Sequence, residues 1–197
     1  ENCTNLSEVN IPQSVIQINK FAFKNCGLIS VILPKGMKNI ESNAFSDCPY
    51  MKSVTISEGV EVIGNAAFAA TALESVNIPS SVKIIETHAF NGCRLLKNVV
   101  ISEGVMYFGV SVFESTALEE VVLPSSVQYI SDLVFYNCIK LKKVTFKSNN
   151  LFYYGDWVFL SCNNIEVFVP SESVDFYSNW LSQYSNITIY EINNEVK

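Results

Sequence analysis

Six cysteines and one histidine are the residues of this chain that are best suited to chemistry. Thiols can form disulfides or bind zinc, and a thiol beside an imidazole can act as a nucleophile. Five cysteines follow a phenylalanine by three residues, and the sixth takes the equivalent place ahead of Leu6: Cys26, Cys48, Cys93, Cys138, Cys162 and Cys3. What these thiols can do therefore depends on the elements that repeat around them.

The cysteine position is also filled by threonine, at Thr71 and Thr116. A place that takes Cys or Thr suits a small, weakly polar side chain that bonds to nearby backbone, which favours a ladder of free, buried thiols. Disulfides between neighbouring copies, Cys3–Cys26 or Cys26–Cys48, are the alternative. Ladder side chains point in parallel, however, which disfavours a disulfide. Zinc is disfavoured because no Cys-x-x-Cys pair occurs.

His88 is the single histidine, and its position in the repeat is variable. The equivalent residues are Phe21, Asn43, Ala66, Ser111, Leu133 and Trp157. A variable position favours a solvent-exposed surface histidine, and a dyad with Cys93 is the alternative. No nucleophile elbow, phosphate loop or His-Glu-x-x-His motif occurs, and the carboxylates are scattered. We therefore expect no enzyme activity, no cofactor and no metal.

A repeat of 22 to 24 residues organises the chain. Its marker is a phenylalanine that recurs at Phe23, Phe45, Phe68, Phe90, Phe113, Phe135 and Phe159. A Val-x-x-Ile set precedes it, as at Val60 and Ile63, and a Leu-x-x-Val-x-Ile set follows it, as at Leu73 to Ile78. One copy cannot enclose its own apolar residues, whereas stacked copies with parallel strands can.

A second period of 45 residues lies over the first. Prolines recur at Pro34, Pro79 and Pro124, and glycines at Gly59 and Gly104. These residues alternate between the turns that follow successive strands, so the sequence predicts a structural unit of two repeats.

The pattern Leu-x-x-Val-x-Ile-Pro-x-Ser-Val-x-x-Ile-x-x-x-Ala-Phe-x-x-Cys resembles the BspA-like leucine-rich repeats. The resemblance implies an α/β-type right-handed solenoid, or horseshoe, that is rich in strands, with little helix and a parallel concave sheet. The proteins of that family are mostly secreted or displayed on cells, in bacteria and some protists, and several are implicated in adhesion and protein binding. An extracellular or cell-surface location follows as an expectation.

We predict a solenoid of about eight repeats over residues 1–170, a cap over 171–190 and a tail over 191–197. The stretch VPSESVDFYSNWLSQYSNI resembles the C-terminal cap of the family. Val174, Tyr177, Leu181 and Tyr184 have helical spacing, which predicts a short capping helix with Ser171 or Ser173 at its start.

The composition excludes two kinds of partner. A formal net charge of −6 and a pI near 4.8 argue against nucleic acid, which needs a basic surface. No apolar run approaches the roughly 20 residues that span a bilayer, so we do not expect a membrane-spanning segment.

Rows of outward residues on the predicted sheet are the candidate binding surface. The first row is Ser7, Ile29, Lys52, Glu74, Lys97, Glu119, Lys142 and Ile165. Five of its members alternate in charge, which predicts ion pairs between neighbouring strands that could help to set the register.

The third row places apolar residues on the same face, at Ile32, Val100, Val122 and Phe168. Exposed apolar residues mark binding surfaces, although β-branched residues also suit strands that face water. The candidate contacts to a protein ligand, such as an extracellular-matrix or host-surface protein, are Ile32, Lys52, Glu74, Lys97, Val100, Glu119, Val122, Lys142 and Phe168. The alternative function is a rigid spacer within a larger surface protein.

Three tyrosines recur on the opposite side of the repeat, at Tyr107, Tyr129 and Tyr153. Tyrosine is frequent at interfaces, but it also serves as half-buried cover. We favour cover for these three.

Overall fold

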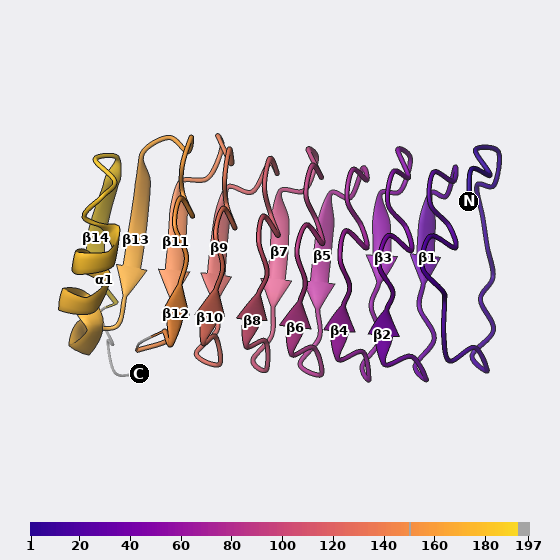
Figure 1. The fold of residues 1–197 in the computed structure, drawn as a ribbon, viewed down its shortest axis with the longest axis horizontal. Helices are drawn as coiled ribbons and strands as arrows, with labels where there is room; N and C mark the ends of the chain where they lie inside the picture. The colour runs from indigo at the N-terminus through magenta and orange to yellow at the C-terminus, as the bar shows by residue number, and fades with distance from the viewer. Residues whose placement is uncertain (150, 193–197) are drawn as a thin grey trace.

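A computed structural model describes residues 1–149 and 151–192 as one stack of coils (Figure 1). Each coil runs through a strand, a turn, a shorter second strand and an arm of tight turns that carries the repeat phenylalanine. The first set of strands is β1 (Ser30–Ile32), β3 (Ser53–Thr55), β5 (Ser75–Ile78), β7 (Asn98–Ile101), β9 (Glu120–Leu123), β11 (Lys143–Phe146) and β13 (Ile165–Val169). The second set is β2 (Asn39–Ile40), β4 (Val62–Ile63), β6 (Ile84–Ile85), β8 (Tyr107–Phe108), β10 (Tyr129–Ile130) and β12 (Tyr153–Tyr154).

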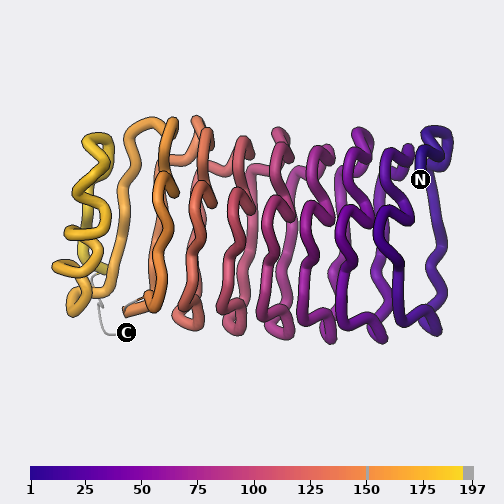
Figure 2. Tube along the Cα trace, in the orientation of Figure 1, coloured from indigo at the N-terminus to yellow at the C-terminus, as the bar shows by residue number. Residues whose placement is uncertain are grey.

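Both sets of strands are parallel, which confirms the predicted solenoid. Ser75 pairs with Asn98 on the first side, and Tyr107 pairs with Tyr129 on the second. Figures 1 and 2 show the coils stacked along a nearly straight axis, with the even-numbered strands nearer the viewer. We call the outer surface of the odd-numbered strands the strand face. The outer surface of the even-numbered strands and their arms is the arm face.

The seven repeat phenylalanines form a continuous column inside the stack. Neighbouring ring centroids lie 5.4 to 5.7 Å apart, with interplanar angles of 2 to 10°. The six from Phe45 to Phe159 are fully buried, and Phe23 at the N-terminal end is partly buried. Each ring thus packs on the coils before and after it, so one repeat depends on its neighbours.

The arms turn sharply because most of them contain two residues with left-handed backbone. Asn43 has a φ of 57° and Asp47 has the same value, and equivalent residues recur along the stack. These residues aim their N–H groups at the next coil: Asn43 donates to the Asn65 carbonyl and Asp47 to the Ala69 carbonyl, both at 2.8 Å. The left-handed conformation thereby directs these backbone donors to a partner in the next coil.

The two-repeat period breaks the strand face into shorter sheets. Hydrogen bonds join β1 to β3, β5 to β7, and β9 to the strands beyond it, whereas the even-numbered strands form one six-stranded sheet. Ser102 and Lys147 each donate a backbone N–H to the preceding coil, at Ile78 and Leu123. Pro79 and Pro124 take that place on the alternate coils. Because proline has no N–H, the ladder ends there.

The same period places a carboxylate under every second turn. Glu103 accepts hydrogen bonds from the backbone N–H and hydroxyl of Ser125 and from the N–H of Ser126, at 3.0 to 3.2 Å. Glu58 makes the equivalent bonds to the next coil, with Ser80 and Ser81. The alternation of Ser-Glu-Gly and Pro-Ser-Ser turns is therefore a hydrogen-bonded pair of turns.

A helix and a strand close the C-terminal end of the stack. The chain forms a 3₁₀ turn, η1 (Ser171–Ser173), then α1 (Val174–Leu181) and β14 (Ile187–Glu191). The predicted helix is confirmed. Ser173 stands at its N-cap without a capping hydrogen bond from its side chain, and Tyr184 lies beyond the helix end.

The C-terminal segment is anchored to the last coils on both sides. Tyr177 donates its hydroxyl to the Ser148 carbonyl at 2.9 Å, and the Phe146 ring packs on Tyr177 and Trp180. β14 continues the sheet in parallel beside β13, a strand that the sequence did not lead us to expect. Residues 193–197 of the predicted tail lie outside the described residues.

Candidate functional site

The cysteines form a column of free thiols that bond to backbone. The Sγ of Cys48 donates to the Phe23 carbonyl at 3.1 Å, and the Sγ of Cys93 donates to the Phe68 carbonyl at the same distance. Four of the six are buried, Cys162 is partly buried and Cys3 is exposed. The threonine copies serve the same carbonyls: Thr71 donates to Phe68 at 2.9 Å and lies 3.2 Å from the sulfur of Cys93. The predicted ladder of free thiols is thus present, although Cys3 at its end is open to solvent.

Burial lowers the reactivity of the enclosed thiols, whereas Cys3 is exposed. Loss of solvation raises the pKa of Cys48 and of Cys93 to about 11, and that of Cys162 to about 12. The thiolate is the nucleophile and the metal ligand, so a raised pKa suppresses both roles. The column is a structural element of the stack.

His88 lies on the surface, at one of the left-handed positions of the arm. Its φ is 59°, and its backbone N–H donates to the Val110 carbonyl of the next coil at 2.8 Å. The side chain is exposed, whereas Cys93 is buried and bonds to Thr71 and Phe68. The two residues therefore do not form the nucleophilic dyad considered as an alternative.

The first row of the strand face is in register. Lys52, Lys97 and Lys142 donate backbone N–H groups to the preceding members Ile29, Glu74 and Glu119 at 2.9 to 3.0 Å. The five charged side chains are all exposed. Ile165 is instead buried, because β13 extends back to this residue and turns its side chain into the core.

The predicted ladder of ion pairs does not form along this row. Within residues 1–149 and 151–192 the ion pairs are Lys24–Asp47 at 3.4 Å and Lys38–Glu61 at 2.6 Å. Lys38 and Glu61 immediately precede β2 and β4, so this ion pair joins two neighbouring coils on the arm face. A hydrogen bond and the charge of Lys38 hold the pKa of the Glu61 carboxyl below its usual value.

The third row presents uncovered apolar side chains on the strand face. Val100 on β7 is 62% exposed and Val122 on β9 is 44% exposed, and Ile32 on β1 also points outward. Val100 and Val122 flank the break between β7 and β9 where the ladder is interrupted. The inward neighbours Val99 and Ile101 of β7 are themselves only partly buried. The sheet here is both apolar and open.

The C-terminal end of the same row is aromatic. Phe168 on β13 stacks on Tyr190 of β14 with centroids 5.1 Å apart, and the Nζ of Lys143 lies 4.5 Å from the Phe168 ring centroid. Phe168 is therefore half-buried and not fully exposed as we expected, while Tyr190 is exposed. Together with Thr145, these residues extend the apolar row from Val100 to the last strand.

Tyr190 is the residue of this row that the sequence did not predict. The alternation in ITIYE, residues 187–191, was the available signal for a further strand. It lies after the helical segment and outside the repeat period, so the predicted boundaries assign it to the cap and tail.

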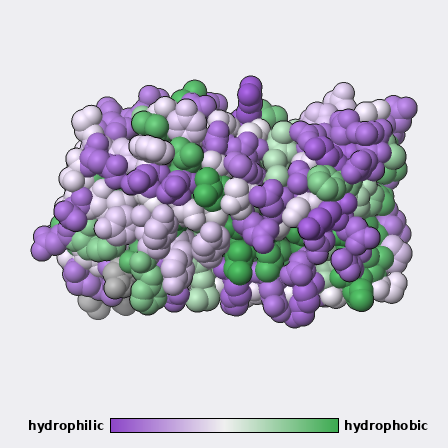
Figure 3. Space-filling view, in the orientation of Figure 1, coloured by the Kyte–Doolittle hydropathy of each residue, from purple (hydrophilic) through white to green (hydrophobic). Residues whose placement is uncertain are grey.

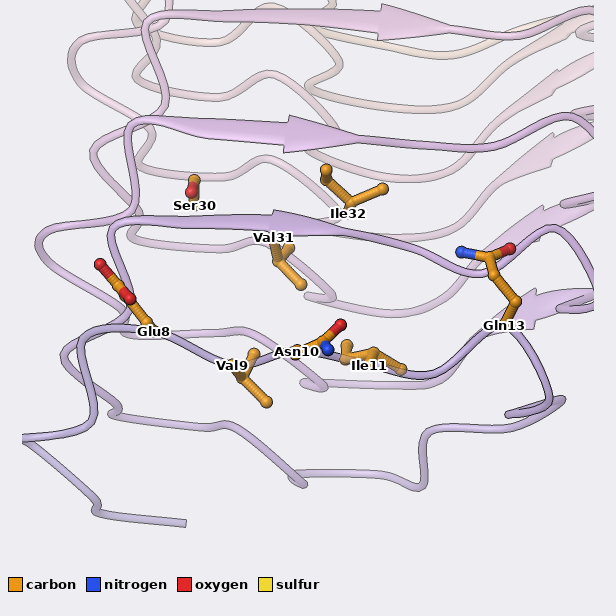
Figure 4. Close-up of a pocket in the computed structure, with 8 residues that line it drawn as sticks. All are labelled: Glu8, Val9, Asn10, Ile11, Gln13, Ser30, Val31 and Ile32. Atoms are coloured by element: carbon orange, nitrogen blue, oxygen red, sulfur yellow. The ribbon is translucent and has the colours of Figure 1, made fainter.

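A shallow groove lies at the N-terminal end of the strand face (Figure 4). It has a volume of about 340 Å³ and lies between residues 8–13 and β1. Figure 4 shows Ser30 and Ile32 on one side of β1 and Val31 on the other. Ile32 thus lines a separate feature, well removed along the stack from Val100 and Val122.

A family comparison covers the whole chain. Residues 1–97 and 83–197 match the BspA type leucine rich repeat region (6 copies). The chain belongs to the BspA-type leucine-rich-repeat family. Comparison with curated proteins found no match.

Solved structures of bacterial leucine-rich-repeat proteins are similar to this BspA-type chain. A leucine-rich repeat protein from Bacteroides ovatus is 25% identical, with a TM-score of 0.75 over 96% of this chain and 56% of that one. A leucine rich cell surface protein from Faecalibacterium prausnitzii is 20% identical, with a TM-score of 0.46 over 89% of this chain and 63% of that one. The pneumococcal vaccine antigen PcpA is 18% identical, with a TM-score of 0.44 over 90% and 71%. This chain thus spans just over half of the Bacteroides protein.

The described residues lack a membrane-spanning helix and a metal cluster. None of their helices is long and apolar enough to cross a membrane. Among residues 1–149 and 151–192, no three His, Cys, Asp or Glu side chains are grouped so that they could hold a metal ion.

Proposed function

We propose that this BspA-type repeat chain is a non-catalytic module that binds a partner protein on its strand face, as part of a secreted or cell-surface protein. The observation that carries the proposal is the uncovered row of Val100 and Val122, continued by Thr145, Phe168 and Tyr190. Contiguous apolar surface of this kind is typical of binding sites on repeat proteins.

The site has the parts of an interface. Burial of the exposed surface of Val100 and Val122 would contribute about 1 kcal/mol each. Lys97 and Glu119 precede β7 and β9 on the same face, and exposed charges at a rim select and orient a partner more than they add affinity. Phe168 and Tyr190 would serve as preorganised aromatic anchors, because each already packs on the other.

Secretion or surface display is supported by family membership, since the proteins of the BspA-like family are mostly secreted or displayed on cells. Extracellular-matrix and host-surface proteins are therefore the partners to test first. The stacked core and the coil-to-coil hydrogen bonds would hold the strand face rigid, which reduces the cost of ordering on binding.

The experiment measures binding of the isolated chain to a panel of extracellular-matrix and host-surface proteins, at low and high salt. Val100→Glu combined with Val122→Glu should abolish saturable binding, because each puts a charge into the apolar contact. Asn77→Glu is the matched control, since Asn77 occupies the same row on β5 and is already polar. Thermal unfolding of each variant shows that the fold persists.

The outcome decides between the functions. Loss of binding in the valine variant alone supports docking on this surface. Unchanged binding would move the site elsewhere on the module. No binding to any protein of the panel would favour a rigid spacer.

A further inference from the structure

The arm face carries a second exposed surface, formed by aromatic side chains in register. Tyr107, Tyr129 and Tyr153 pair across β8, β10 and β12 and project outward. The row beside them contains Met106 and Phe152, whose backbone N–H groups hydrogen-bond to the preceding coils. Five large side chains on three successive coils thus share one surface.

The rings form a continuous platform and are open to solvent. The Tyr107 and Tyr129 centroids lie 6.3 Å apart, and those of Tyr129 and Phe152 lie 6.0 Å apart. Phe152 is 74% exposed and Tyr153 is 50% exposed, while Tyr107 is half-buried. The tyrosine row was predicted to be half-buried cover; Tyr107 fits that description, whereas Tyr129 and Tyr153 leave more of their surface exposed. Figure 3 shows hydrophilic and hydrophobic side chains mixed on this face, with pale atoms of intermediate hydropathy common on its C-terminal half.

The three arms that carry this platform contain acidic residues and no basic ones. Residues 105–115, 127–137 and 151–161 of these three coils contain Glu114, Asp132 and Asp156, and no Lys, Arg or His. The corresponding arms nearer the N-terminus carry basic residues, namely Lys20, Lys24, Lys38, Lys83 and His88. Those arms also carry the acidic residues Glu41, Asp47, Glu61 and Glu86. The aromatic half of the arm face therefore differs in having acids without basic partners in its arms.

One of these acids, Asp132, lies near the tyrosine row. The Oδ1 of Asp132 accepts the backbone N–H of Asp156 at 2.9 Å. The Tyr107 hydroxyl lies 3.3 Å from the Ser131 hydroxyl, next to Asp132 in the chain. Lys83, the basic neighbour of Met106, turns away and donates its Nζ to the Ser80 carbonyl at 3.2 Å.

We propose that this arm patch, defined as Met106, Tyr107, Tyr129, Asp132, Phe152 and Tyr153, binds an extended Arg- and Lys-rich segment of a partner protein. Guanidinium and ammonium groups stack on the faces of aromatic rings and are attracted by nearby carboxylates. The ring centroids lie 6.0 to 6.3 Å apart, close to the roughly 6.6 Å that an extended chain advances in two residues. Alternate residues of an extended segment can therefore place cations over consecutive rings. An acidic ligand would be repelled. This surface lies on the other side of the solenoid from the strand face, so the two proposals stand independently.

The test uses the whole chain and a fluorescent peptide of about ten residues in which Arg alternates with Gly. Anisotropy titrations are run at about 50 and 300 mM salt, where screening lengths differ. We expect saturable binding that weakens with salt. A peptide of the same length with citrulline in place of Arg should not bind, because citrulline keeps the shape of the side chain without its charge.

Two variants locate the site. Phe152→Ala with Tyr153→Ala should weaken binding about tenfold, since it removes two exposed ring faces. Asp132→Asn should weaken it severalfold, because it removes the charge and keeps an oxygen for the Asp156 N–H. Glu74→Gln on the strand face is the matched control: it removes one charge from an exposed site and should leave the affinity unchanged.

Each contrary result overturns the proposal. Equal binding of the citrulline peptide would show that cations are not recognised. An equal effect of Glu74→Gln and Asp132→Asn would show that only the net charge of the chain attracts the peptide. Binding of neutral glycans in place of the Arg peptide would assign the rings to sugars. Loss of peptide binding in the Val100→Glu/Val122→Glu variant would show that the peptide binds the strand face instead.

Discussion

The left-handed backbone of the arms allows a change in the free energy of unfolding to be predicted at two equivalent positions. Ala70 and Gly92 stand on consecutive coils with φ values of 54° and 70°. Each donates its N–H to the next coil at 2.8 Å, to Asn91 and Glu114 respectively. Ala70→Gly should therefore raise the free energy of unfolding, and Gly92→Ala should lower it.

The magnitude follows from the backbone alone. A Cβ at Gly92 would meet nothing closer than the Cα and N of Ala70, at 3.9 Å, so no clash contributes. The left-handed conformation costs an L-residue about 1 to 2 kcal/mol, and the extra freedom of glycine in the unfolded chain offsets about 0.5 to 1 kcal/mol of that. Each substitution should change stability by about 0.5 to 1 kcal/mol, with opposite signs, and the double variant should lie near the parent.

Urea unfolding followed by circular dichroism measures these differences. Gly59→Ala is the comparison with a steric cost, because at a φ of 107° its Cβ would lie 2.9 Å from the Lys35 carbonyl oxygen. It should destabilise the chain more than Gly92→Ala does. A destabilising effect of Ala70→Gly would show that the left-handed conformation at these positions costs an L-residue no free energy, which would refute the prediction.

Three further predictions concern the core, the thiols and the paired turns. Phe90→Ala should lower the free energy of unfolding, measured with urea, by about 3 to 5 kcal/mol, and Phe23→Ala should lower it clearly less. Phe90 stacks on two rings, whereas Phe23 stacks on one. Equal losses would contradict a column in which each inner ring is packed from both sides. At pH 8 a thiol reagent should label Cys3 quickly, whereas Cys93, whose pKa is raised to about 11 by burial, should react only after unfolding, with a thiolate fraction of about one in a thousand; fast labelling of two or more thiols in the folded chain would count against the buried column. Partial burial raises the pKa of Glu103, but the hydrogen bonds from the next coil and the charge of Lys147 outweigh it and leave the pKa below 4.5. The ionised carboxylate therefore stabilises the fold above pH 4.5, and this contribution is lost as the pH falls through the pKa of Glu103 in the folded chain. Because this carboxylate is largely exposed, Glu103→Gln should lower the melting temperature only slightly at pH 7, and the difference should shrink as the pH falls below 4.5. A difference that stays constant down to pH 2 would exclude the carboxylate as its source.

The periodic residues made most of the fold predictable. The spacing of Phe68 and Phe90 requires stacked coils, and the alternation around Val76 and Val99 fixes which side chains face the core. The side chains of Val100 and Val122 could be assigned to the outer surface for the same reason, since each lies between two residues that face the core. These inferences need only the backbone period, which the sequence displays directly.

Side-chain partners could not be predicted in the same way. Lys97 and Glu119 occupy neighbouring places in their row, yet exposed side chains have many rotamers of similar energy, and the ion pair forms instead between Lys38 and Glu61. Phe168 is half-buried because β14 adds Tyr190 beside it. That strand belongs to no repeat, so the period carried no information about it.

The pairing of Glu103 with Ser125 and Ser126 has a consequence for how such a chain can change in length. Removal of one coil would place a Ser-Glu-Gly turn beside another turn of the same kind, and the carboxylate would lose its serine donors. Removal of two consecutive coils would leave every remaining carboxylate beside its serines and every proline at its own break in the sheet. The segment that can be duplicated or lost without a mismatch is thus the double coil, so chains built on this plan should differ from one another by even numbers of coils.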